Sequence, residues 1–124
     1  MRENPFVKLF LPLGRFEAVL ATLEDAVNDA PRAPEYLGRI LAKVITESMV
    51  TLKEVGDLIY QGGEEPGALR EAGLAADVLG NVLKAIRSEK GEGFLTDVRT
   101  NSNLRLETFR PPDPMKSKVL EEFI

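Results

Sequence analysis

Residues 23–34, LEDAVNDAPRAP, end one helical pattern and open the next. Asp25 and Asp29 lie four positions apart at the end of an apolar-periodic stretch. At a helix C-terminus, two like charges at this spacing repel each other and face the negative end of the helix dipole, so stability alone does not select them. Pro31 and Pro34 fix φ and push the residue before each of them away from the helical region, which stiffens the turn. The stretch therefore predicts a rigid, negatively charged corner between two helices.

This acidic corner has two interpretations. A rigid turn that carries unpaired carboxylates suits the binding of a basic partner surface, because little ordering entropy is lost on docking. Alternatively, both aspartates are simply solvated, as most surface aspartates are, and the prolines only connect two helices. The residues of the corner leave both interpretations open.

Beyond the corner, apolar residues recur at helical spacing through nearly the whole chain. Thr51 and Glu54 have the spacing of a capping box, which predicts a helix start at Leu52. The first expected helix covers residues 12–28, the second is opened by Pro34 and carries Leu37 to Ile45, and the third runs from Leu52 to a stop at Gly62-Gly63. A fourth helix, broken near Gly73, is expected to end by Gly91, and two short helical pieces follow at residues 94–99 and 104–109. A last helix, opened by Pro114, is expected to carry Met115, Val119, Leu120 and Phe123.

Helices that are joined by short turns, each with one apolar stripe, must bury those stripes against one another. Antiparallel hairpins stacked side by side are the expected solution. The pattern thus predicts an all-α fold of HEAT-like stacked helical hairpins, with about six helices and no sheet.

Length and charge limit the function. A chain of 124 residues is long enough to bury one core. Its formal net charge of −4 and its pI near 5.0 repel polyanions on average, which disfavours direct binding of nucleic acid.

Two absent residue types limit the chemistry. The chain has no Cys and no His, which excludes disulfides, thiolate zinc sites and His-based acid–base or nucleophilic catalysis. We therefore predict a protein that is not an enzyme and has no metal site and no cofactor. The longest apolar run, residues 9–13, is too short for a membrane span, and residues 1–11 lack the features of a secretory signal. A cytoplasmic location without membrane contact is expected.

The segment from Asp25 to Pro34, followed by Leu37-Gly38, closely resembles the acidic corner of MA-3 domains. These are HEAT-like helical modules of the translation initiation scaffold, factor 4G, and of the tumour suppressor called programmed cell death protein 4. Other segments resemble the C-terminal end of plant-type factor 4G chains, namely Leu58-Ile59, Gly62-Gly63-Glu64-Glu65-Pro66-Gly67, Leu79-Gly80, Ser102-Asn103-Leu104-Arg105 and Phe109-Arg110-Pro111-Pro112.

The resemblance implies a domain organisation. Residues 1–11 would be an N-terminal segment of uncertain order, residues 12–63 the second half of an MA-3-like domain, and residues 64–124 a C-terminal helical extension packed on it. A missing first half would leave an apolar face exposed. That face would be covered by the apolar residues of segment 6–11, or it would drive self-association of the chain.

The resemblance also implies a function. MA-3 modules dock on the lobes of a DEAD-box RNA helicase of the initiation factor 4A type, so this chain would be a non-catalytic adaptor. Asp25 and Asp29 match the family's acidic contact positions, and Asp25 stands where some members have Glu. Pro31, Arg32 and Pro34 match the turn that presents them. Other parts of the initiation scaffold would be further partners.

Two other functions stay open. One is a structural helical module whose apolar stripe pairs with the rest of a larger chain or with a second copy. The other is an RNA-binding helical repeat, although aromatic residues that could stack bases are scarce, with two Tyr and no Trp. The basic residues of such an RNA-binding strip would be Arg99, Arg105, Arg110, Lys116 and Lys118.

Overall fold

The computed structural model describes residues 23, 26–27, 30–47, 50–62, 67–113 and 115–123. Within these ranges the secondary structure consists of α4 (Ala33–Thr46), α5 (Leu52–Gln61), α6 (Ala68–Ala72), α7 (Leu74–Ser102) and the 3-10 helices η2 (Leu106–Phe109) and η3 (Val119–Phe123), without a strand. The all-α prediction is confirmed for this part of the chain. The HEAT-like stacking and the total of about six helices stay predictions, and most of the expected helix 12–28 lies outside the described residues.

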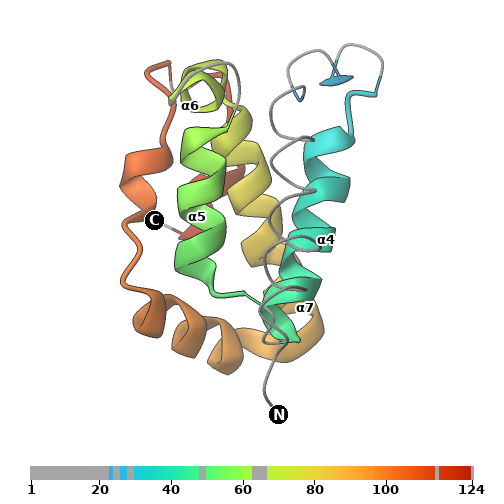
Figure 1. Ribbon diagram of the computed structural model, residues 1–124, viewed down its shortest axis with the longest axis vertical. Helices are drawn as coiled ribbons and strands as arrows, with labels where there is room; N and C mark the ends of the chain where they lie inside the picture. Colours follow the sequence, from blue (N-terminus) through green and yellow to red (C-terminus); the bar gives the residue numbers. More distant parts are fainter. Residues whose placement is uncertain are drawn as a thin grey trace, which may run out of the picture.

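Helix α7 is the element on which the others assemble. It packs against α4, α5, α6, η2 and η3. In Figure 1, α4 and the first part of α7 run side by side, and α5 lies next to them. After Ser102 the chain passes back along α5 through η2, and η3 lies against α7. Residues far apart in the sequence therefore meet on α7.

The starts of α4 and α5 follow from their sequences. Pro34 lies in the first turn of α4, where its missing N–H costs no helical hydrogen bond, and the helix begins one residue earlier, at Ala33. At α5, the Thr51 hydroxyl accepts a hydrogen bond from the backbone N–H of Glu54, and the Glu54 carboxylate accepts one from the backbone N–H of Thr51. The predicted capping box and the predicted start at Leu52 are confirmed.

The predicted break near Gly73 is confirmed, since Gly73 adopts a left-handed conformation between α6 and α7. The predicted helix end by Gly91 and the separate helical segment after it are also found, since the backbone of Gly91 is not helical. Gly91 has φ 91° and ψ 169°, a region open essentially to glycine alone, and the chain bends there but continues as helix to Ser102. α7 thus consists of two limbs, residues 74–90 and 92–102, joined at Gly91.

The predicted last α-helix is wrong. Residues 115–118 form no helix, η3 is a single 3-10 segment, and the Met115 side chain is 75% exposed instead of buried. The Asp113 side chain accepts a hydrogen bond from the backbone N–H of Met115 at 2.9 Å, which closes a tight turn in place of a helix start. Because Gly80 has no side chain, the backbone at Val119 can lie directly on α7. A Cβ at position 80 would clash with Val119. The C-terminal segment therefore makes a close backbone contact with α7 where the sequence predicted an α-helix.

One hydrophobic core unites the described elements. Val27 packs at its edge, and Leu23 is fully buried within it. Its fully buried large side chains are Leu23, Leu41, Leu52, Ile59, Leu69, Leu79, Leu83, Ile86, Leu120, Val55 and Val78. Since α4, α5, α7 and η3 all contribute, residues on both sides of positions 63 and 64 share this core, and the predicted division into an MA-3-like half and an extension stays a prediction. No helix in the described ranges is both long and apolar enough to cross a bilayer.

Candidate partner-binding site

The turn that joins residue 26 to α4 is held by backbone hydrogen bonds. The N–H of Ala30 donates to the Ala26 carbonyl at 2.8 Å, and the N–H of Ala33 donates to the Ala30 carbonyl at 2.9 Å. Pro31 is exposed, whereas Pro34 is buried and fixes the turn from inside. Of the predicted site residues, Pro31, Arg32 and Pro34 are thus brought together in one turn. Asp25 and Asp29 lie outside the described residues.

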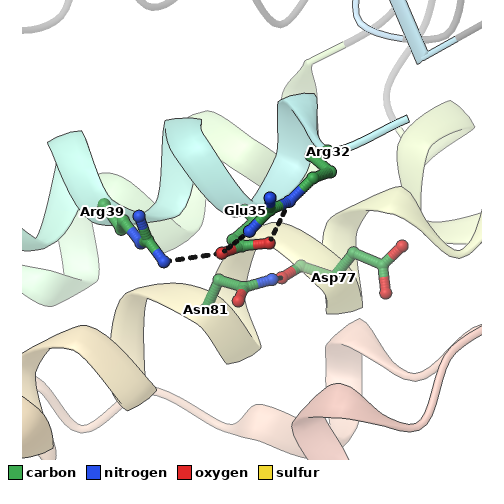
Figure 2. Close-up of polar contacts among 5 residues, drawn as sticks. All are labelled: Arg32, Glu35, Arg39, Asp77 and Asn81. Atoms are coloured by element: carbon green, nitrogen blue, oxygen red, sulfur yellow. Dashed lines mark hydrogen bonds and ion pairs between the residues drawn. The ribbon is translucent and has the colours of Figure 1, made fainter. Parts of the chain in front are cut away.

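Arg32 turns its guanidinium toward α4 (Figure 2). Its Nε and Nη2 donate to the two carboxylate oxygens of Glu35 at 3.1 and 3.0 Å. Nη2 of Arg39 donates to the same carboxylate at 2.7 Å. One acidic side chain therefore holds two guanidinium groups in place along the first two turns of α4.

The charges around Glu35 keep it ionised. The hydrogen bond from Arg32 is the main cause that lowers the pKa of Glu35, and the nearby charges of Arg32, Arg39 and Lys84 act in the same direction. The same hydrogen bond raises the pKa of Arg32. Two arginines thus pair with one carboxylate, and the charge of Lys84 on α7 acts on it from further away.

Tyr36 lies between the two arginines. The guanidinium carbons of Arg32 and Arg39 are 5.4 and 6.0 Å from the centre of its ring, within the range of cation–π attraction. The Tyr36 side chain is nevertheless 48% exposed, and Ile40, one turn further along α4, is 51% exposed. This face of α4 presents an aromatic and an aliphatic group to the solvent.

A groove of about 680 Å³ runs beside this face. Asn81 in its wall donates through Nδ2 to the backbone carbonyl of Asp77 at 2.7 Å (Figure 2), which fixes its side chain along α7. The residues that line the groove are Glu35, Arg39, Asn81, Lys84, Ala85, Ser88, Glu89 and Val119.

Asp77 connects α7 to the C-terminal segment. The Ser117 hydroxyl, which is 8% exposed, donates to Oδ1 of Asp77 at 2.5 Å. Burial raises the pKa of Asp77, and the hydrogen bond from Ser117 opposes part of this effect. The ionised carboxylate is therefore destabilised by its surroundings even though it has a partner.

We predict that Asp77→Asn is at least as stable as the wild type at neutral pH. A carboxyl with a raised pKa in the folded state binds a proton more readily there than in the unfolded state, so it destabilises the fold above that pKa and ceases to do so as the pH falls through it. The amide oxygen introduced at position 77 can still accept from Ser117. Urea unfolding at neutral and acidic pH should show an advantage of the variant that shrinks on acidification.

Asp97→Asn, at an exposed carboxylate on the same helix, is the matched control for the loss of one negative charge. An advantage of Asp77→Asn that grows toward acidic pH would contradict the proposed cause.

Neither a metal site nor a free basic strip is evident in the parts that the structure describes. These parts contain no group of three or more Asp or Glu side chains that could hold a metal ion. Within the predicted RNA-binding strip, Arg99 donates to the Phe123 carbonyl at 2.7 Å, Arg110 pairs with Glu121 at 2.9 Å, and Lys116 donates to a backbone carbonyl of α6. These intramolecular contacts weaken the RNA-binding alternative.

Known proteins with closely similar sequences come from plants. Over 109 residues, 88% of this chain, the sequence is 79% identical to the protein named eukaryotic translation initiation factor 4G of Cucumis melo. The chain is homologous to a short segment of plant initiation factor 4G. Initiation factor 4G of Arabidopsis thaliana is 59% identical over 87% of the chain, and that of Triticum aestivum is 57% identical over 82%.

The chain spans only 6 to 7% of the length of these initiation factor 4G proteins. No protein-family profile matches the chain, and no solved structure matches it either. The comparisons therefore show similarity to a short stretch of proteins named initiation factor 4G and name no domain.

The charged side chains around Glu35 were not predicted from the sequence, although part of this cluster has a local sequence signal. Arg32, Glu35 and Arg39 have the i,i+3 and i,i+4 spacing that brings charged side chains together on a helix. Lys84 carries no such local signal, because it reaches Glu35 only through the packing of α7 on α4.

Proposed function

We propose that this chain is a non-catalytic docking module of a translation initiation scaffold. The observation that carries the proposal is the 79% identity, over most of the chain, to a protein named initiation factor 4G. In this proposal the chain works in the cytoplasm, beside other parts of the same scaffold.

The partner that we propose is a DEAD-box RNA helicase of the initiation factor 4A type. This part rests on the resemblance of residues 25–34 to the acidic corner of MA-3 domains. Asp25 and Asp29 would meet basic side chains of the helicase, and the turn of Pro31, Arg32 and Pro34 would hold them in position.

The geometry of the turn supports this assignment. Pro34 is buried in the first turn of α4, and backbone hydrogen bonds connect Ala26, Ala30 and Ala33 in sequence. A turn that is fixed before binding loses little conformational entropy when a partner docks on it. The direction of the chain at Ala30 is therefore set by the fold.

The test is the affinity of purified helicase for the Asp25→Lys/Asp29→Lys variant. Reversing two contact charges should weaken binding by at least about tenfold at low salt, because attraction becomes repulsion, and by less at high salt, where surface charges are screened. Titration calorimetry at two salt concentrations measures both effects. Circular dichroism checks that the fold is retained.

Asp97→Lys/Glu107→Lys is the matched control, since it changes the net charge equally at two exposed positions elsewhere in the chain. Equal affinity of the two variants would contradict the acidic-corner mechanism. No binding by the wild type would contradict the helicase assignment and favour the structural module.

A further inference from the structure

We propose that phosphorylation of Ser117 releases the C-terminal segment, residues 115–123, from α7 while the helices stay folded. Ser117 would then be a regulatory modification site. The inference goes beyond the proposed function, because it concerns the chain alone and needs no helicase.

Ser117 is enclosed together with a carboxylate. Among the described residues it is the only polar or charged residue that is buried. Its hydroxyl donates to Oδ1 of Asp77 at 2.5 Å, and Asp77 is itself partly buried. A group that is added to this hydroxyl oxygen therefore lies directly against Asp77.

The backbone on both sides of Ser117 lies close to the start of α7. A Cβ at Gly73 would be 2.9 Å from Cβ of Lys116, and a Cβ at Gly80 would be 2.6 Å from Cγ1 of Val119. Asp77 lies midway between the two glycines along the chain, so close contacts flank the buried hydroxyl. A phosphoryl group has no room there unless the segment moves away from α7.

The charges at this site also oppose a phosphoryl group. Burial raises the pKa of Asp77, so its ionised form is already disfavoured in the docked state. A phosphoserine at neutral pH adds a charge of about −1.5 to −2, and beside a carboxylate it acts by like-charge repulsion and desolvation. Lys116 donates through Nζ to the Glu71 carbonyl at 3.0 Å, which directs its charge toward the end of α6. Release of the segment returns both negative groups to water.

The helices keep a core of their own when the segment leaves. Leu41, Val55 and Leu83 are fully buried and belong to α4, α5 and α7, whereas Leu120 and Phe123 are the large side chains that the segment adds. The segment contains the 3-10 helix η3 and no α-helix. A segment with few buried contacts opens locally at a lower free energy than the helices of a core.

A kinase acts on the released segment, because Ser117 is only 8% exposed when it is docked. Lys116 and Lys118 on either side are exposed, and residues 115–118 form no helix, so the opened segment offers a serine between two cations. A serine kinase transfers the γ-phosphoryl group of ATP to Oγ. The bond from the γ-phosphorus to its bridging oxygen breaks, the bond to Oγ forms, the hydroxyl proton passes to the base of the kinase, and ADP leaves. The modified segment then stays released, because the phosphoryl group disfavours only the docked state.

The test is amide hydrogen exchange of the full chain with phosphoserine incorporated at position 117. The N–H of Glu121, which donates to the Lys118 carbonyl, reports docking of the segment. Its exchange should accelerate by at least about tenfold relative to the unmodified chain, and in the modified chain it should be at least about tenfold less protected than the N–H of Leu83 in α7. Circular dichroism checks that the helices are retained.

Two further proteins separate the causes. Phosphoserine in place of Met115, which is 75% exposed in the same segment, adds the same charge away from Asp77 and should change the exchange by less than about twofold, since solvent screens it. With phosphoserine at position 117 in the Asp77→Asn variant, the acceleration should fall to at most about a third, because the like charge is removed.

Unchanged exchange at Glu121, equal acceleration by phosphoserine at position 115, or an undiminished effect in Asp77→Asn would overturn the proposal. Equal protection of Glu121 and Leu83 in the modified chain would also overturn it, because the segment and the helices would then open together. Slower exchange at Glu121 would show that Lys116 or Lys118 binds the phosphoryl group and would reverse the proposed effect.

Discussion

Removal of residues 113–124 should lower the free energy of unfolding by about 3 to 6 kcal/mol, because Leu120 and Phe123 are buried and each such side chain contributes about 1.5 to 3 kcal/mol. The loss is large for a small domain, whose total stability is typically about 5 to 15 kcal/mol. Chemical denaturation followed by circular dichroism measures it. An unchanged unfolding curve would show that the segment contributes nothing to the core.

Polar contacts of the same segment should matter much less. Glu121 pairs with Arg110 at 2.9 Å, and Glu122 pairs with Arg87 at 2.9 Å, but all four side chains remain partly solvated. Exposed ion pairs contribute little, because solvent screens them and ordering long side chains costs entropy. Leu120→Ala/Phe123→Ala should therefore reproduce most of the loss, and Glu121→Gln/Glu122→Gln only a small part of it.

The second large effect is expected for Gly38→Leu, at the contact between α4 and α7. A Cβ at position 38 would lie 2.6 Å from Cβ of Asn81 and 3.0 Å from backbone atoms of Val78 and Val82. The backbone of α7 cannot move aside without separating the two helices, so a whole leucine side chain should cost about 3 kcal/mol. Urea unfolding gives the value.

Gly93→Leu is the matched control for that substitution. Gly93 is helical, exposed, and has no atom within 4 Å of its added Cβ. Leucine is a better helix former than glycine, so this variant should gain up to about 1 kcal/mol. Similar changes at positions 38 and 93 would show that the close approach of α4 and α7 is not the cause.

Local signals predicted the elements whose cause is local. The capping box at Thr51, the proline at the start of α4 and the break at Gly73 all act within a few residues, and the structure contains each of them. The C-terminal segment was mispredicted because its path depends on Gly80, which lies nearly forty residues earlier in the sequence. The helical spacing of apolar residues within one segment carries no information about a contact between residues so far apart in the sequence.

The acidic corner and the cluster around Glu35 also differ in how far local sequence signals can predict them. The acidic corner could be proposed from the spacing of Asp25, Asp29 and the prolines, and its role stays a prediction. The cluster around Glu35 could be predicted only in part, because Lys84 and the groove require α7 to pack on α4. Resemblance to a family identified the acidic corner and gave no information on this cluster.

The bend at Gly91 gives η3 a mechanical role. Arg87 precedes the bend and contacts both Glu92, just after it, and the Phe123 ring of η3, while Arg99 of the far limb holds the Phe123 carbonyl. The two limbs and η3 thus form a closed ring of contacts around the bend at Gly91. Displacement of η3 would break both contacts of Phe123 at once, and the burial of Leu95 in the core would then be what keeps the far limb in its orientation.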